Sequence, residues 1–163
     1  MPDTKHTLVA LVEDKPGVLN RVASLFRRRA FNIQSLAVGH SEQPGLSRMT
    51  VVVSGDSAMV EQVRKQLDKL INVIRVSDIT GEAIVARELA LIKVKATAST
   101  RSEIIQLVDI FRANIIDVAS DSLTVEVTGD EDKVESLMEL LRGFGIKEVT
   151  RTGRIALTRG SSL

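Results

Sequence analysis

The sequence predicts an α+β fold made of two tandem ferredoxin-like βαββαβ units. The order strand, helix, strand, strand, helix, strand can be read twice along the 163 residues. A chain of this length accommodates two small units of about 80 residues each. Its apolar fraction of 44% comes with only four aromatic residues, so the core must be aliphatic. We expect domains at 1–78 and 79–163.

The two halves also share local sequence. Gly55-Asp56 and Gly129-Asp130 each precede a predicted helix, and both aspartates are good helix caps. Asn32-Ile33 and Asn114-Ile115 open equivalent predicted strands. These matches support an internal repeat, although the order of the elements is the stronger indication.

Periodicity and turn residues predict the elements of the first unit. In order, we expect a strand at 8–12, a helix from Val18 to an arginine-rich end at 27–29, strands at 33–38 and 48–53, a helix capped by Asp56 with Val60, Val63, Leu67 and Leu70 on its apolar face, and a strand at 73–76.

The second unit follows a predicted linker at 78–87. We expect a strand at 89–96, a helix capped by Ser99 or Ser102 and carrying Ile104, Val108 and Phe111, strands at 114–118 and 123–127, a helix capped by Asp130, a strand at 146–150 and an edge strand at 154–158.

Composition narrows the function classes. The net charge of +1 gives no electrostatic reason to bind nucleic acid or an anionic membrane. The absence of cysteine excludes disulfides and thiolate nucleophiles. No apolar run approaches the roughly 20 residues of a membrane span, and the first residues lack a signal-peptide pattern. We expect a cytoplasmic protein.

Catalytic residues are not expected in this chain. Its two histidines, His6 and His40, are far apart in sequence, and no nucleophile, metal or phosphate-binding motif occurs. The acidic residues lie mainly at predicted helix caps and on polar faces. We therefore expect neither a catalytic group nor a metal site.

The segment 13–19 is the best candidate for a ligand site. Gly17 opens the first helix, where free backbone N–H groups and the positive end of the helix dipole favour an anion. Without a Cβ, Gly17 lets a ligand approach the backbone closely. Asp14 offers a carboxylate for an ammonium group, so the pair suits a zwitterionic amino acid. An ordinary turn before a helix would need the same residues.

The second unit provides an internal comparison. Its corresponding turn, 97–100, contains neither glycine nor a carboxylate. If the loop served the fold alone, both units would share its geometry. This contrast favours a ligand site confined to the first unit.

Asn32 lies at the start of the second strand, which is an edge strand in a sheet of order 4-1-3-2. Its unpaired groups invite pairing with a second copy around a two-fold axis. Asn32 would then face the Gly17 loop of the partner copy. Alternatively, Asn32 only tolerates an awkward turn conformation.

These residues resemble a known family, the small subunits of acetolactate synthase with their ACT domain. The resemblance rests on the segments 14–22 (DKPGVLNRV), 28–36 (RRAFNIQSL), 46–50 (LSRMT), 66–70 (QLDKL), 73–76 (VIRV), 87–94 (RELALIKV), 111–113 (FRA), 116–118 (IDV) and 159–160 (RG). It covers essentially the whole chain, and it makes the first unit an ACT domain.

The resemblance implies a non-catalytic regulatory subunit in branched-chain amino-acid biosynthesis. Its partner would be a large catalytic subunit that carries thiamine diphosphate, magnesium and FAD. The small subunit would activate this partner and confer feedback inhibition by valine. In the family, the effector lies at the interface of an ACT homodimer.

Carried over to this chain, the resemblance implies an effector site made of Asp14, Gly17, Val18, Leu19, Asn32 and Ile33. The amides around Gly17 would hold the effector carboxylate, and Asp14 and Asn32 its polar groups. Many members of the family have Asn where this chain has Asp14, so the charge differs here.

Four polar residues of the first helix are candidates for contact with the large subunit: Asn20, Arg21, Arg27 and Arg28. For the arginines, solvated cations at a helix C-terminus are the favoured explanation.

Two other functions stay open. A stand-alone tandem ACT sensor could act on another enzyme or on transcription. An RNA-binding module would need stacking aromatics on its central strands, and 8–12 and 48–53 contain none.

Overall fold

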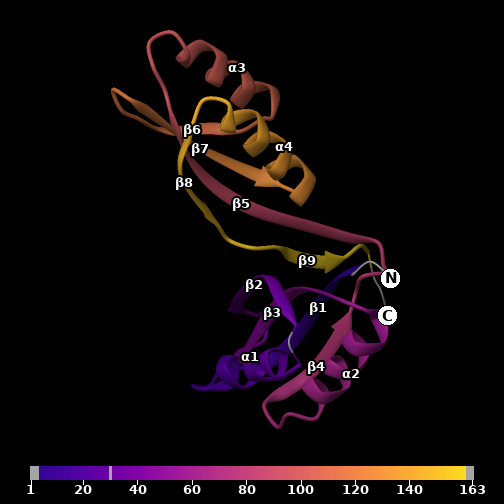
Figure 1. Ribbon diagram of the computed structural model, residues 1–163. Helices are drawn as coiled ribbons and strands as arrows, with labels where there is room; N and C mark the ends of the chain where they lie inside the picture. Colours follow the sequence, from indigo (N-terminus) through magenta and orange to yellow (C-terminus); the bar gives the residue numbers. More distant parts are fainter. Residues whose placement is uncertain (1–3, 30, 161–163) are drawn as a thin grey trace. The chain divides into compact units, whose positions relative to one another are not determined.

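The computed structural model describes residues 4–29 and 31–160 and divides the chain into two compact units (Figure 1). The first unit runs to Val85 and also includes the segment that begins at Arg154, whereas the second is Ala86–Gly153. The predicted boundary after residue 78 therefore differs from the structure in two ways. The division lies seven residues later, and the last segment returns to the first unit. The described residues leave out 1–3, 30 and 161–163. The predicted domains include these positions, and the segment 28–36 includes residue 30.

The predicted element order of the first unit is confirmed. Its elements are β1 (Thr4–Glu13), α1 (Val18–Arg28), β2 (Asn32–His40), β3 (Leu46–Gly55), α2 (Ser57–Asp68) and β4 (Val73–Asp78). The strands form an antiparallel sheet of order β2-β3-β1-β4, which is the predicted order. Several strands are longer than predicted because their hydrogen-bonded ladders continue into partly exposed residues.

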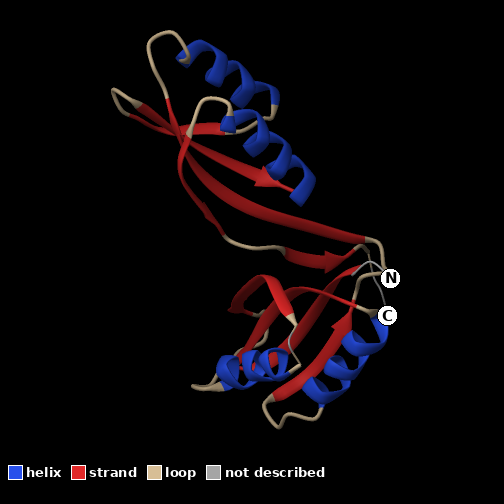
Figure 2. Cartoon of the chain, viewed as in Figure 1, coloured by secondary structure: helices blue, strands red, loops and turns tan. Residues whose placement is uncertain are grey.

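Alternation along β1 separates the two faces of this sheet. Leu8, Ala10 and Val12 are buried in the core under the two helices, where they join Phe26 of α1 and Val63 of α2. Figure 2 shows both helices on this face. The intervening residues of β1 lie on the opposite face, which we call the open face of the sheet.

The second unit repeats the plan. Its elements are β5 (Ile84–Lys95), α3 (Arg101–Ile110), β6 (Asn114–Val118), β7 (Ser122–Gly129), α4 (Glu131–Arg142) and β8 (Ile146–Arg151). The sheet order, β6-β7-β5-β8, matches that of the first unit. Ile92, Ile104, Val125 and Leu137 are fully buried in its core. Among residues 4–29 and 31–160, no helix has both the length and the apolar character needed to cross a membrane.

The start of α3 corrects one prediction. Neither Ser99 nor Ser102 caps this helix, because Thr100 is the flanking residue and makes no side-chain cap bond. The Thr100 hydroxyl instead accepts a hydrogen bond from the Thr97 amide at 2.8 Å. At the other end, Phe111 lies just beyond the helix rather than within it.

The predicted last strand is present as β9 (Ile155–Thr158), and it pairs with β5. Because this pairing extends the ladder, β5 begins at Ile84 and the predicted linker 78–87 is shortened. Within the first unit, the Arg159 amide donates to the Ala83 carbonyl at 2.8 Å. The Arg154 amide donates to Ser35 Oγ at 2.6 Å. These bonds hold the returning segment on the first unit.

The helix caps and the edge strands show the repeat at the level of single atoms. The Oδ1 atoms of Asp56 and Asp130 accept backbone amides, each at 2.9 Å. The predicted caps are confirmed. Both edge strands also carry a register shift at the same place, after Ile33 in β2 and after Ile115 in β6.

We expect Asp56→Ala and Asp130→Ala each to lower the free energy of unfolding by about 1 kcal/mol, because each leaves a helix-terminal amide without its acceptor. Chemical denaturation followed by circular dichroism measures the change. The matched variants Asp56→Asn and Asp130→Asn keep the side-chain oxygen and should stay close to the parent. Equal losses in the alanine and asparagine variants would contradict the capping role.

Candidate ligand site at the start of the first helix

Gly17, between β1 and α1, adopts a left-handed conformation with φ 85° and ψ −11°. A Cβ placed on Gly17 would meet no atom within 4 Å. Other residues avoid this backbone region, so glycine is required by conformation rather than by crowding. The backbone here is not covered by its own chain and remains open to a ligand.

Two backbone donors at the start of α1 have no acceptor within the described part of the chain: the amides of Leu19 and Asn20. The neighbouring Val18 amide reaches the Lys15 carbonyl only at 3.4 Å. The first turn contains no acidic side chain that could neutralise the positive end of the helix. This arrangement can accept one carboxylate.

Neighbouring loops hold the β1–α1 loop in place. The Asp14 amide donates to the Gly45 carbonyl at 2.9 Å, and the Glu13 amide donates to the Asn72 carbonyl at 2.8 Å. The Asn72 side chain also donates to Glu13 Oε2 and accepts from Arg21. Hydrogen bonds from Lys15 and Asn72 lower the pKa of Glu13 and keep it charged. The loop is therefore anchored at both of its ends.

Asp14 supplies the acidic group predicted for the site. Its side chain is half exposed, and Oδ2 lies 3.2 Å from Nδ1 of the exposed His40. A solvent-exposed pair of this kind is weak, so the carboxylate stays available to a ligand cation. Leu19 presents an exposed aliphatic side chain, at 46% exposure, next to the free amides.

Asn32 and Ile33 lie at the other end of α1, which is about 16 Å long for its 11 residues. The structure therefore does not bring Asn32 to Gly17 within one chain. Asn32 is exposed at the start of the edge strand β2, whereas Ile33 is partly buried and packs against the core. The predicted site residues thus form two separate groups.

Among residues 4–29 and 31–160, the edge strand β2 pairs with β3 alone. Leu36 and Val38 of β2 are 36% and 48% exposed. An edge strand with unpaired backbone groups and exposed aliphatic side chains is a template for pairing with another strand.

The polar residues predicted for partner contact are all exposed, but they make local bonds. Arg21 donates to Asn72, Arg27 donates to Ser24 Oγ at 3.4 Å, and Arg28 donates to the Ser24 carbonyl at 3.5 Å. Asn20 accepts the Ser24 hydroxyl on its carbonyl. Arg27 and Arg28 also lie in the last turn of α1, where cations are favourable.

The corresponding turn of the second unit is bonded within itself by hydroxyl groups, although the Ser102 and Glu103 amides at the start of α3 also have no acceptor among the described residues. The Thr97 hydroxyl lies 3.0 Å from Ser99 Oγ, and the Thr97 amide is bound by Thr100. No left-handed glycine precedes α3. The hydroxyls of this turn satisfy one another, so the two units differ in geometry where they differ in sequence.

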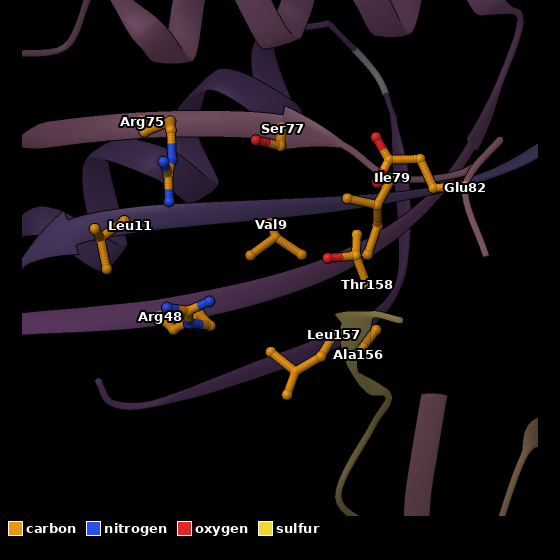
Figure 3. A pocket seen from close by; sticks show the side chains of 10 residues that line it. All are labelled: Val9, Leu11, Arg48, Arg75, Ser77, Ile79, Glu82, Ala156, Leu157 and Thr158. Atoms are coloured by element: carbon orange, nitrogen blue, oxygen red, sulfur yellow. The ribbon is translucent and has the colours of Figure 1, made fainter. Parts of the chain in front are cut away.

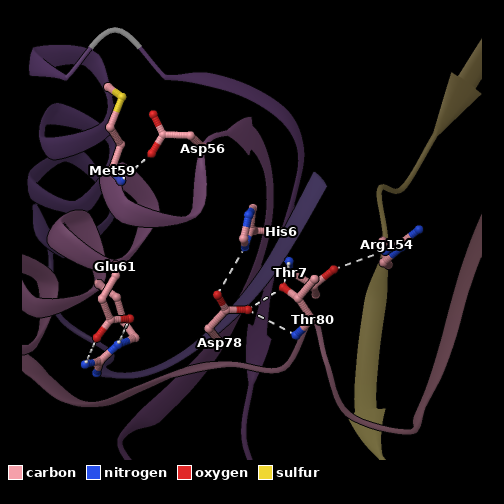
Figure 4. A network of polar contacts seen from close by, with 9 residues as sticks. His6, Thr7, Asp56, Met59, Glu61, Asp78, Thr80 and Arg154 are labelled. Atoms are coloured by element: carbon pink, nitrogen blue, oxygen red, sulfur yellow. Dashed lines mark hydrogen bonds and ion pairs between the residues drawn. The ribbon is translucent and has the colours of Figure 1, made fainter. Parts of the chain in front are cut away.

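Neither histidine lies in a catalytic cluster. His6 is buried, with Nδ1 3.2 Å from Asp78 Oδ2, and its Nε2 has no hydrogen-bond partner among the described residues. Asp78 also accepts the Thr80 amide at 3.0 Å (Figure 4). No group of three or more potential metal-binding side chains occurs in residues 4–29 and 31–160. The His6–Asp78 pair joins residues 72 positions apart, a contact that the sequence pattern does not reveal.

The Asp78 pair predicts a pH dependence. Burial raises the pKa of Asp78, but hydrogen bonds from Thr80 and His6 outweigh it, so the folded pKa lies below the usual value. A lowered folded pKa means that the stabilisation is present at neutral pH and is lost as the pH falls through that pKa. We expect Asp78→Asn to lower the free energy of unfolding at pH 7 by about 1–3 kcal/mol.

Denaturation between pH 7 and pH 2 tests this dependence. The difference in the free energy of unfolding between the parent and Asp78→Asn should become smaller toward pH 2. Asp121→Asn is the surface comparison: Lys147 lowers the pKa of Asp121 too, but both side chains are exposed, so this variant should stay close to the parent at every pH. A gap that stays constant with pH would disprove the role of the Asp78 charge.

Comparison with known proteins assigns both halves of the chain. Residues 8–75 match the family model described as the AHAS small subunit-like ACT domain. Residues 87–160 match the model described as the small subunit of acetolactate synthase. The two matched ranges follow the two units of the fold, except that the second range includes 154–160, which belongs to the first unit.

Full-length relatives agree with these matches. The chain is 60% identical over 157 residues to the probable acetolactate synthase small subunit of Archaeoglobus fulgidus, covering 96% of this chain and 98% of the relative. It is 56% identical over 160 residues to the acetolactate synthase small subunit of Mycobacterium bovis, covering 98% and 95%. The crystal structure of the small subunit from Thermotoga maritima superposes with a TM-score of 0.89 at 45% identity, over 98% of this chain and 99% of that one.

Proposed function

This chain belongs to the family of acetolactate synthase small subunits, and we propose that it binds valine where two copies of its ACT domain meet. One observation carries the proposal: the left-handed Gly17 is uncovered and is followed by two amides without acceptors. This is a site for a small carboxylate that must approach the backbone closely.

Each part of valine has a counterpart around Gly17. The carboxylate accepts hydrogen bonds from the amides around Gly17, and Asp14 receives the ammonium group. Leu19 contacts the aliphatic side chain, which favours a branched-chain amino acid over a polar one. Asn32 of a second copy completes the polar contacts, because the Asn32 of the same chain lies at the far end of α1.

The homodimer forms by pairing of two β2 strands. The unpaired backbone of β2 supplies hydrogen bonds, and Leu36 and Val38 supply apolar contact. A two-fold axis at this edge repeats the same contact on both copies and creates two equivalent effector sites.

The regulatory output acts on a large catalytic subunit. That subunit carries thiamine diphosphate, magnesium and FAD, and this chain contributes no catalytic group. In the cytoplasm, the small subunit raises the activity of the large subunit, and valine reverses this effect. Valine can do so only by preferring one dimer packing, with a coupling free energy of about 1–3 kcal/mol. The exposed face of α1, with Asn20, Arg21, Arg27 and Arg28, transmits the change.

Gly17→Asp tests the site directly. We expect the new carboxylate to repel that of valine and to raise the concentration for half-inhibition at least tenfold, equivalent to about 1.4 kcal/mol. Feedback inhibition of the enzyme reconstituted with the large subunit measures this change. Activation without valine should persist, because the substitution lies on an exposed loop.

Two variants serve as controls for Gly17→Asp. Gly160→Asp places the same charge at another uncovered left-handed glycine, at φ 64°, and should keep feedback. Gly17→Asn carries the same backbone strain without the charge and should impair feedback less than Gly17→Asp. Unchanged valine inhibition with Gly17→Asp would remove the site from this loop.

Leu36→Glu combined with Val38→Glu tests the dimer. We expect like charges facing each other across the β2 edge to shift the protein toward monomer and to weaken valine binding in parallel. Sedimentation velocity and calorimetry measure the two effects. Ile74→Glu, on the opposite edge strand β4, is the control, since Ile74 is also exposed. A double variant that remains dimeric would place the interface elsewhere.

A further inference from the structure

A second hollow lies in the first unit, on the open face of the sheet away from α1 (Figure 3). Strand register brings two cations together there, because Leu11 of β1 pairs with Arg48 of β3 on one side and with Arg75 of β4 on the other. The two arginines are 27 positions apart in the sequence, and nothing in its local pattern joins them.

The arginines are built into this face. Leu11 is only 7% exposed although no helix covers it. Its cross-strand neighbours are the two arginines, whose methylene stems can cover an apolar residue while their charged ends reach solvent. Arg48 pairs with the exposed Glu42 at 3.1 Å, a weak surface contact. The side chain of Arg75 makes no hydrogen bond or ion pair among the described residues. Two guanidinium groups thus lie at one end of the hollow, and that of Arg75 has no acidic partner among the described residues.

The rest of the hollow combines an apolar wall with polar groups, among them the carboxylate of Glu82 near Ile79, and belongs entirely to the first unit. Val9, Ile79, Ala156 and Leu157 line it, and the hydroxyls of Ser77 and Thr158 lie between them. Its volume is about 290 Å³, which suits a small metabolite rather than a large cofactor. Ala156, Leu157 and Thr158 come from β9, so the returning segment forms one wall.

The shape selects the chemical class of the ligand. Arg75 and Ile79 are four residues apart in an extended segment, which is about 13 Å. A free α-amino acid is too short to place its carboxylate on the arginines and its ammonium on Glu82 near Ile79. A short aliphatic chain with one terminal carboxylate meets both the cations and the apolar wall.

We propose that this hollow is a second small-molecule site, which binds an aliphatic carboxylate lacking an α-ammonium group. The anion is held by Arg48 and Arg75 in the bidentate geometry that guanidinium groups favour. The aliphatic body lies along Val9, Ile79 and Leu157. This site uses β1, β3, β4 and β9, whereas the valine site uses the start of α1, so the two ligands do not compete.

The full-length chain can be tested by methyl NMR with hexanoate and 4-methyl-2-oxopentanoate as probes. We expect both carboxylates to shift the methyl signals of Val9, Leu11 and Ile79. Hexylammonium and hexanol have the same chain without the anion and should not do so at equal concentration. Whichever of the two carboxylates shifts the signals at the lower concentration shows whether a simple fatty acid or a 2-oxo acid is the better ligand. Equal shifts with hexylammonium would overturn the proposal. So would the absence of shifts with either carboxylate at ten times the valine concentration that saturates the valine site.

Variants make the assignment residue-specific. Arg75→Gln should weaken hexanoate binding at least tenfold, and Leu157→Glu should do the same by placing a negative charge on the wall. Both residues are exposed, so the fold should persist. Arg64→Gln, on α2, is the matched control and should bind as the parent does. Hexanoate should also slow amide hydrogen exchange in β9. Undiminished binding in both Arg75→Gln and Leu157→Glu would overturn the proposal.

Discussion

The alternation of side chains along β1 decides which parts of the first unit are core and which can meet a ligand. β1 lies between β3 and β4, so its register fixes both neighbours. Leu8, Ala10 and Val12 are held under the helices, and Leu11 is left between two arginines on the other face. Where β1 ends, the left-handed Gly17 turns the chain into α1. Both candidate sites therefore depend on one strand.

Local patterns in the sequence were enough to predict the fold, because a ferredoxin-like unit is specified by short periodic segments and by caps. Asp56 and Asp130 are caps in the structure as predicted, and the order of both sheets is confirmed. The prediction of a serine cap for α3 is wrong because Thr100 flanks the helix, and its hydroxyl accepts the Thr97 amide of the preceding turn. The return of 154–160 to the first unit was also missed, since it depends on long-range bonds such as that from Arg154 to Ser35.

The candidate sites were predictable to different degrees. A glycine before a helix and a nearby carboxylate are visible in sequence, so Gly17 and Asp14 could be proposed together. The separation of Asn32 from Gly17 by the length of α1 follows from helix geometry and makes the site incomplete in one chain. Arg48 and Arg75 could not be joined without the register of β3, β1 and β4. Both proposals place a carboxylate on the first unit, one at the loop before α1 and the other on the open face of the sheet.

The central claim is that one valine site is shared by two chains, and a mixed dimer tests it most directly. Dimers assembled from one Gly17→Asp chain and one Asn32→Ala chain contain one doubly altered site and one unaltered site. Each variant alone should bind no valine in calorimetry, whereas the purified mixed dimer should bind one valine per dimer with parental affinity. A mixed dimer that binds no valine would contradict the shared site, because a site within one chain would be damaged in both partners.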